Sequence, residues 1–189
     1  ASLTSGLGDP VSWLFVLIGF PVLLYLSKKQ FHAVETRKFK YDQLATITIT
    51  IEKDVITLPG LLDSGNQLLD PITKTPVMIV EVAALQTFIP EEIIQAMDSI
   101  EQTQGWPTFS DETRWVERIR IIPYRAVGKD TTLMLAIKPD KAVIHHDNMR
   151  YETSKFLLGL TKTQLSSEGD YVCILHPKML QGEVVGQVS

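Results

Sequence analysis

The stretch that decides the fold is residues 44–65, LATITITIEKDVITLPGLLDSG, in which two apolar segments lead to one acidic turn. Threonine and isoleucine alternate over residues 46–51, which is the two-residue period of a strand with one buried face. A polar break at residues 52–54 follows, and residues 55–58 read as the returning strand of a hairpin. Pro59-Gly60 is expected to end that strand. The sequence therefore predicts a β-hairpin just before an acidic turn.

The rest of the chain reads as short strands around one helix. The helix is expected to begin at Pro90, with acidic residues in its first turn, and to run for about ten residues. Further strands are predicted for residues 77–80, 118–124, 132–137, 142–144 and 171–175. A turn of helix is expected over residues 161–166, and the tail is expected to fray from Gln181. This pattern predicts a mainly β domain, a small barrel or sandwich, with one or two short helices.

The acidic turn follows two leucines in the pattern Leu-Leu-Asp-Ser-Gly over residues 61–65. Two apolar residues followed by Asp-Ser/Thr-Gly form the active-site loop of aspartic proteases. Their two carboxylates share one proton across a water, because both cannot ionise at short range. One carboxylate then activates the water, while the other protonates the scissile carbonyl and later the leaving amine. Asp63 would be such a carboxylate, the Ser64 hydroxyl would bond across two loops, and Gly65 would let the loops approach closely.

An ordinary turn is the alternative interpretation, because Asp and Ser cap turns and Gly adopts positive φ. Two placed features favour the protease. The hairpin ends directly at the two leucines, and Leu157-Leu158-Gly159 supplies an apolar-apolar-Gly element farther along the chain. In retropepsins such an element packs under the active-site loop. We therefore expect a retropepsin-like closed β-barrel, with Asp63 as catalytic residue and with Leu158 and Gly159 packing under its loop.

The single Asp-Ser-Gly loop has a consequence for assembly. A two-lobed aspartic protease needs two such loops on a longer chain, and this body, residues 44–189, holds one. The dyad must then form between two copies of Asp63 related by a two-fold axis. A monomer would be inactive, so dimerisation could serve as the switch.

The apolar excess of this 189-residue chain, whose mean hydropathy is +0.08, lies at its front. Residues 11–26 carry no charge and would extend about 24 Å as a helix, against roughly 30 Å for a bilayer core. A buried core helix is one alternative. A signal peptide is another, although no basic residues precede the run and no small-residue cleavage site follows it. With Trp13 and Tyr25 near its ends, we expect a transmembrane helix over residues 1–27, the last of a larger membrane domain.

Basic residues follow this run and set its orientation. Five of the 18 Lys and Arg residues and two of the 22 Asp and Glu residues lie within residues 1–40, which leaves a balance of −7 for residues 41–189. The positive-inside rule then predicts that the domain at residues 44–189 is cytoplasmic. The basic linker, residues 28–43, would lie against anionic lipid. An acidic body argues against a nucleic-acid partner.

A metal or cofactor is not expected. His145-His146-Asp147 is the best candidate for a metal site, but the four histidines lack the spacing of ligand pairs. The single cysteine, Cys173, cannot form an intrachain disulfide and reads as a buried core thiol.

Three aromatic residues, Trp106, Trp115 and Tyr124, have two interpretations. They would line a substrate cleft in a protease, but such side chains more often belong to a core. A flap over the site is expected from a retropepsin-like fold, and the turn at residues 128–130 is our candidate for its tip.

Longer runs resemble one family, the sporulation sigma-E factor processing peptidases. These runs are LLDSGNQLLDPITKTPVMIVE at residues 61–81, RIRIIPYRAVG at residues 118–128, LAIKPD, LLGL and ILHPKML. The resemblance implies a multi-pass protein of the cell membrane, whose membrane domain is joined to a retropepsin-like cytoplasmic domain with Asp63 as the catalytic aspartate. It also implies the sigma-E precursor as substrate, and activation by a signalling protein that the forespore secretes and that acts on the membrane domain. Ser64 stands where many proteins of the wider fold have Thr, and it retains the hydroxyl.

Two other classes of function stay open. A non-catalytic, membrane-tethered β-domain would bind a partner without needing Asp63. A lipid-binding surface protein would depend on the basic residues between 28 and 40 instead. Substitution of Asp63 separates both classes from a protease.

Overall fold

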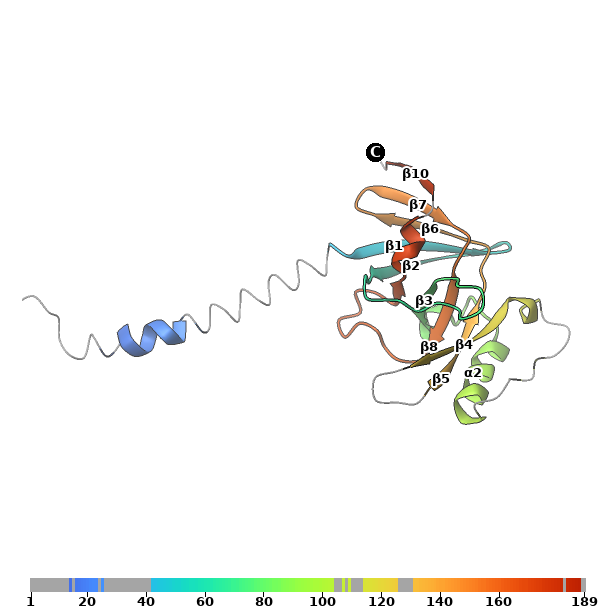
Figure 1. Cartoon of the computed structure of the whole chain (residues 1–189), viewed down its shortest axis with the longest axis horizontal. Coiled ribbons are helices and arrows are strands. Elements are labelled where there is room, and N and C mark those ends of the chain that lie inside the picture. Colours follow the sequence, from blue (N-terminus) through green and yellow to red (C-terminus); the bar gives the residue numbers. More distant parts are fainter. Residues whose placement is uncertain are drawn as a thin grey trace, which may run out of the picture. The chain divides into compact units, whose positions relative to one another are not determined.

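The chain divides into two compact units, Ala1–Asp42 and Gln43–Ser189, in the computed structural model (Figure 1). Residues 14, 16–23, 25, 42–103, 107, 109, 114–125, 131–181 and 183–187 are described. Those between residues 14 and 25 are helical. No helix within the described ranges is long and apolar enough to cross a membrane. The transmembrane helix expected over residues 1–27 is therefore not confirmed.

The second unit is built on one sheet. Its strands are β1 (Leu44–Ile51), β2 (Asp54–Leu62), β3 (Val77–Glu81), β4 (Ile119–Arg125), β5 (Thr131–Ile137), β6 (Lys141–His146), β7 (Met149–Thr153), β8 (Leu157–Thr161), β9 (Cys173–Leu175) and β10 (Glu183–Gln187). Its helices are α2 (Glu91–Thr103) and three short 3-10 helices, η1 (Val82–Leu85), η2 (Val116–Arg118) and η3 (Pro177–Gln181). The strand order is β10-β7-β6-β1-β2-β9-β3-β8-β5-β4.

The sheet is mixed, and it is open within the part of the chain that the structure describes. Strands β2 and β9 pair in parallel, as do β3 and β8. Strands β10 and β4 end the order, and no pairing of described residues joins them. The mainly β class is confirmed. Barrel closure and the retropepsin-like fold are not confirmed and stay predictions.

The β1–β2 hairpin is confirmed. Ile47, Ile49 and Ile51 are at most 1% exposed, while the threonines between them face outward. The expectation that Pro59-Gly60 ends the second strand is wrong, because β2 continues to Leu62. The Pro59 carbonyl accepts a hydrogen bond from the Val172 N–H, so the backbone polar groups of Pro59 point away from β1. The pairing of β2 with β1 therefore does not need an N–H from residue 59, and proline is tolerated there.

Three strands, β7, β8 and β10, were not predicted, and one predicted helical turn is absent from the described residues. Strand β7 has no clear alternation, with all five residues half-buried. The tail does not fray from Gln181, since β10 pairs with β7. Residues 161–166 form no turn of helix, because the Leu165 N–H bonds the Glu81 carboxylate at 2.7 Å and the chain bends there instead.

The core lies between the sheet and α2, which packs along β5 (Figure 1). Ile93, Met97 and Ile100 are buried, at the spacing of one helix face. Cys173 is fully buried, as predicted, and this burial, followed by the charge of Glu81, raises the pKa of its thiol to about 12. The thiol is therefore un-ionised at neutral pH and inert.

A loop over residues 63–76 joins β2 to β3 around the end of β9. Asp70 is buried inside it and accepts hydrogen bonds from the Ile72 N–H at 2.9 Å and the Thr73 hydroxyl at 2.7 Å. Burial acts to raise the pKa of Asp70, but these hydrogen bonds and the charge of Arg120 outweigh it and lower that pKa below 3.8. The loop is thus ordered around an ionised carboxylate.

Replacing Gly159 with valine is expected to destabilise the second unit by about 1–3 kcal/mol through overpacking. A Cβ at this position would lie 2.5 Å from the Met134 sulfur and 2.9 Å from a Val77 methyl. Urea unfolding measures the loss, with the exposed Val55→Ala as control, which should stay near wild type. Equal midpoints for the two variants would show that β8 can move away from its neighbours.

Replacing Asp70 with asparagine is expected to reduce stability in a pH-dependent way. Because the pKa of Asp70 is lower in the folded state, its contribution is fully present above the ordinary value of 3.8 and is lost as pH falls through the lowered value. The stability gap to Asp70→Asn should therefore be constant near neutral pH and should narrow below pH 3.8. Urea titrations from neutral to acidic pH measure it, with the exposed Asp42→Asn as control. A gap that stays constant in acid would assign the effect to shape rather than charge.

Candidate active site

Asp63 is the first residue after β2 and opens a tight turn. Its carbonyl accepts a hydrogen bond from the Asn66 N–H at 3.1 Å, and its Oδ1 accepts one from the Gly65 N–H at 2.8 Å. The Asp63 side chain is half-buried, while Ser64 and Gly65 are exposed. The predicted Asp-Ser-Gly turn therefore exists, and the backbone of the turn itself fixes the carboxylate.

The residue before Asp63 is held from the other side by the start of β1. The Leu62 N–H donates to the Gln43 carbonyl at 2.8 Å, and Leu61 pairs with Leu44 in the sheet. The turn thus directly follows the last residue pair of the β1–β2 hairpin, which the threonine–isoleucine alternation predicts.

Asn66 is a positioning residue that the sequence analysis missed. Its side chain is 8% exposed, donates from Nδ2 to the Val77 carbonyl at 3.1 Å and accepts the Leu68 N–H at Oδ1. These bonds tie the turn to the first residue of β3. An asparagine after Asp-Ser-Gly reads as a solvated turn residue, so only the contact with β3 identifies its role.

Asp70 is the other carboxylate of the loop, and it is not available for chemistry. One of its oxygens accepts from Ile72 and the other from Thr73. The loop of one chain therefore presents a single carboxylate, Asp63. A proton-sharing dyad requires a second one from outside this loop.

Leu158 and Gly159 lie on β8, which pairs in parallel with β3. Leu158 is fully buried in the main core, and the Met134 and Val77 side chains occupy the space that a Cβ on Gly159 would need. Because Asn66 binds the Val77 carbonyl, the described contacts connect β8 to the turn through β3. Packing of Leu158 and Gly159 directly under the turn stays a prediction.

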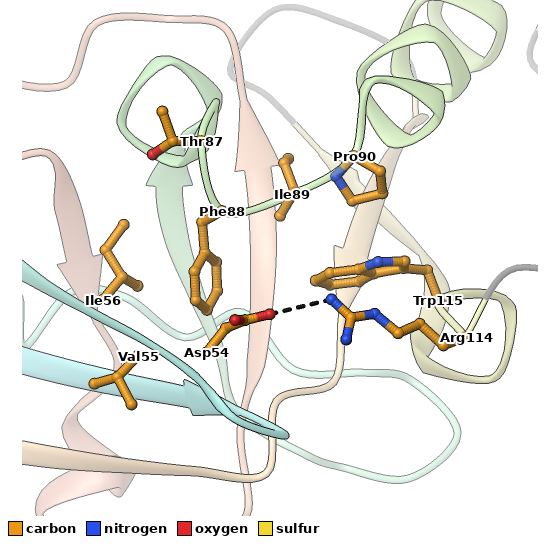
Figure 2. Close-up of a pocket in the computed structure, with 9 residues that line it drawn as sticks. All are labelled: Asp54, Val55, Ile56, Thr87, Phe88, Ile89, Pro90, Arg114 and Trp115. Atoms are coloured by element: carbon orange, nitrogen blue, oxygen red, sulfur yellow. Dashed lines mark hydrogen bonds and ion pairs between the residues drawn. The ribbon is translucent and has the colours of Figure 1, made fainter.

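Trp115 belongs to the core and also lines a groove of about 440 Å³ at the start of β2 (Figure 2). The Arg114 guanidinium lies 5.5 Å from its ring centroid and pairs with Asp54 at 3.1 Å. Asp54 and Asp63 flank opposite ends of a nine-residue stretch, about 27–30 Å apart. This groove is therefore separate from the Asp63 turn.

No described contact joins Tyr124, another predicted cleft residue, to Asp63. Tyr124 packs against a small core cluster and lines a cavity between α2 and β5. Trp106 and the proposed flap tip at residues 128–130 lie outside the described residues.

His146 has a structural partner at each ring nitrogen. Its Nδ1 lies 3.1 Å from the Leu44 carbonyl and its Nε2 lies 3.3 Å from an Asp147 oxygen. No group of three metal-ligating side chains occurs among the residues that the structure describes. His146 thus serves to hold the first residue of β1.

Comparisons with known proteins agree with one another. The family model for sporulation factor SpoIIGA matches residues 1–179. The sporulation sigma-E factor-processing peptidase of Priestia megaterium is 41% identical over 182 residues, which are 96% of this chain and 58% of the relative. The protein of the same name from Bacillus subtilis is 36% identical over 185 residues, which are 98% of this chain and 60% of the relative.

No solved structure matches this chain. The chain spans about three fifths of the length of these two relatives. Its identity to both is high enough to assign the family across nearly the whole chain. The resemblance seen in the sequence is thereby confirmed, and the chain belongs to the family of the sporulation factor SpoIIGA.

Proposed function

We propose that this chain carries the catalytic part of an aspartic endopeptidase that works as a homodimer and removes the pro-sequence of the sigma-E precursor during sporulation. The observation that carries the proposal is the turn at Asp63, half-buried at a strand end, with one carboxylate oxygen on the Gly65 N–H. The names of the relatives support the substrate.

Two copies of the turn, related by a two-fold axis, would bring two Asp63 carboxylates together around one water. Two carboxylates on either side of one water cannot both ionise, so the pair shares one proton. One carboxylate is then a base and the other an acid. The base removes a proton from the water as its oxygen attacks the scissile carbonyl carbon. The acid protonates the carbonyl oxygen, and a proton then passes to the amine nitrogen as the peptide bond breaks.

The other turn residues have roles in the same scheme. Ser64 is exposed beside the carboxylate, so its hydroxyl is free to bond to the second loop. A Cβ on Gly65 would lie 3.1 Å from Asp63 Oδ1, so glycine keeps room beside the carboxylate. The backbone N–H of Gly65 holds Oδ1 in one orientation, and Asn66 holds the turn against β3.

Membrane anchoring is part of the proposal and rests on residues 1–43. The uncharged run at residues 11–26 would be the last helix of a membrane domain, and the basic residues after it would place the catalytic unit in the cytoplasm beside anionic lipid. A signalling protein from the forespore would act on that membrane domain and promote pairing of the catalytic units.

Asp63→Asn is expected to abolish processing, with a loss on the order of a thousandfold or more, because both dyad carboxylates disappear together. The full-length protein is co-expressed with the sigma-E precursor, and shortening of the precursor is read on a gel. Asp54→Asn, an exposed aspartate at the other end of β2, is the matched control and should process normally. Processing that survives Asp63→Asn would make the turn structural and favour a non-catalytic module.

Mixing active and inactive chains tests the shared dyad. If each active site needs Asp63 from both copies, equal expression of wild type and Asp63→Asn leaves about one quarter of the dimers intact by random pairing. Processing should then fall to about a quarter, at unchanged total protein, rather than to the half expected of independent chains. A rate at half would show that one chain suffices.

A further inference from the structure

His176 is a buried ionisable residue that the scheme above does not use. It follows β9 directly and is 3% exposed. Its Nδ1 accepts a hydrogen bond from the Lys178 N–H at 3.1 Å. Its Nε2 is buried and has no hydrogen-bond partner among the described residues. Burying a polar atom without a hydrogen-bond partner reduces folding stability, so a histidine at this position needs a physical explanation.

The register of the sheet places His176 beside Asp63. Strands β2 and β9 run in parallel, and their last rung pairs Leu62 with Leu175. The residues that directly follow these two strands are Asp63 after β2 and His176 after β9, at the same edge of the sheet. Neighbouring strands lie about 4.8 Å apart, and parallel partners point to the same face. Asp63 and His176 therefore occupy neighbouring positions just beyond the ends of β2 and β9.

The protonation state of His176 follows from its hydrogen bond. Because Nδ1 accepts the Lys178 N–H, we infer that the ring proton is on Nε2. Burial, followed by the charge of Lys178, lowers the pKa of His176. Strand β7, which packs against η3 next along the chain, carries Arg150, Tyr151 and Glu152. His176 thus offers a neutral Nε2–H donor at neutral pH.

Asp63 has a carboxylate oxygen that could accept the hydrogen bond that His176 can donate. Its Oδ1 accepts the Gly65 N–H, while no hydrogen bond of Oδ2 occurs within the described part of the chain. A buried donor without an acceptor and a carboxylate oxygen without a donor therefore lie at adjacent positions of one sheet edge.

We propose that His176 is a positioning residue for Asp63, whose Nε2–H donates to Asp63 Oδ2 when two turns meet in the active dimer. The inference rests on the proposed function. Oδ1 then keeps the Gly65 N–H and turns its remaining lone pair toward the water and the partner's carboxylate. A neutral donor also favours the ionised form of the carboxylate, which is the form that acts as base.

Two substitutions separate the two ring nitrogens. His176→Asn keeps an acceptor near the position of Nδ1 and removes the Nε2–H, whereas His176→Gln keeps a donor near the position of Nε2. Both are made in the full-length protein, and processing of the sigma-E precursor is measured as kcat and KM over a range of pH. Urea unfolding and sedimentation check fold and dimer for each variant.

His176→Asn is expected to lower kcat about tenfold or more with KM unchanged, which is the loss of one hydrogen bond to a charged group. The acid limb of its pH profile should move to higher pH, because the ionised carboxylate loses a donor. His176→Gln should retain most of kcat and the wild-type pH profile.

A purely structural role predicts a different result, in which both variants lose stability and activity alike while the pH profile stays in place. That result overturns the inference, as does failure of both variants to fold. Asp63→Asn is run in parallel to distinguish the two proposals. If Asp63→Asn is inactive and His176→Asn behaves as wild type, only the role of His176 fails. If Asp63→Asn is active, the proposed function fails and the role of His176 fails with it.

Discussion

The structure depends on the placement of β9, three residues long, between β2 and β3. It pairs in parallel with β2 and antiparallel with β3, so both neighbours are held by the same short strand. As a result, β2 and β9 end at the edge of the sheet where β3 begins. The loop that carries Asp63 has to close around this edge. The Asp63 carboxylate and the Asn66 anchor therefore lie at the same edge of the sheet as the buried His176, which follows them by more than one hundred residues of chain.

Much of this framework could be predicted from the sequence, because its signals are local. The threonine–isoleucine alternation identifies β1, and the acidic turn after two leucines identifies the candidate site. Local signals fail where tertiary contacts decide. Pro59 reads as a strand end, but its missing N–H costs nothing at that position, and β2 continues. Asn66 and His176 have ordinary local sequences, so only the neighbouring strands show that they are buried.

The fold and the chemistry impose different requirements on the turn. The fold needs a tight connection from β2, which Asp-Ser-Gly-Asn provides through its own backbone. Aspartic protease chemistry needs two carboxylates, and the loop supplies one because Asp70 is committed to its own hydrogen bonds. In the proposed homodimer, a half-buried Asp63 beside an exposed Ser64 would satisfy both requirements, because the second copy would supply the other carboxylate.

The hydrogen bond from the Leu62 N–H to the Gln43 carbonyl sets a limit on trimming the protein for biochemical work. Gln43 is the first residue of the second unit and also the acceptor for the residue that precedes Asp63. A fragment that begins at Leu44, where β1 formally starts, would leave that N–H without its partner. The shortest fragment that preserves the backbone bond next to Asp63 must therefore begin no later than Gln43, with its amino terminus one residue outside the sheet.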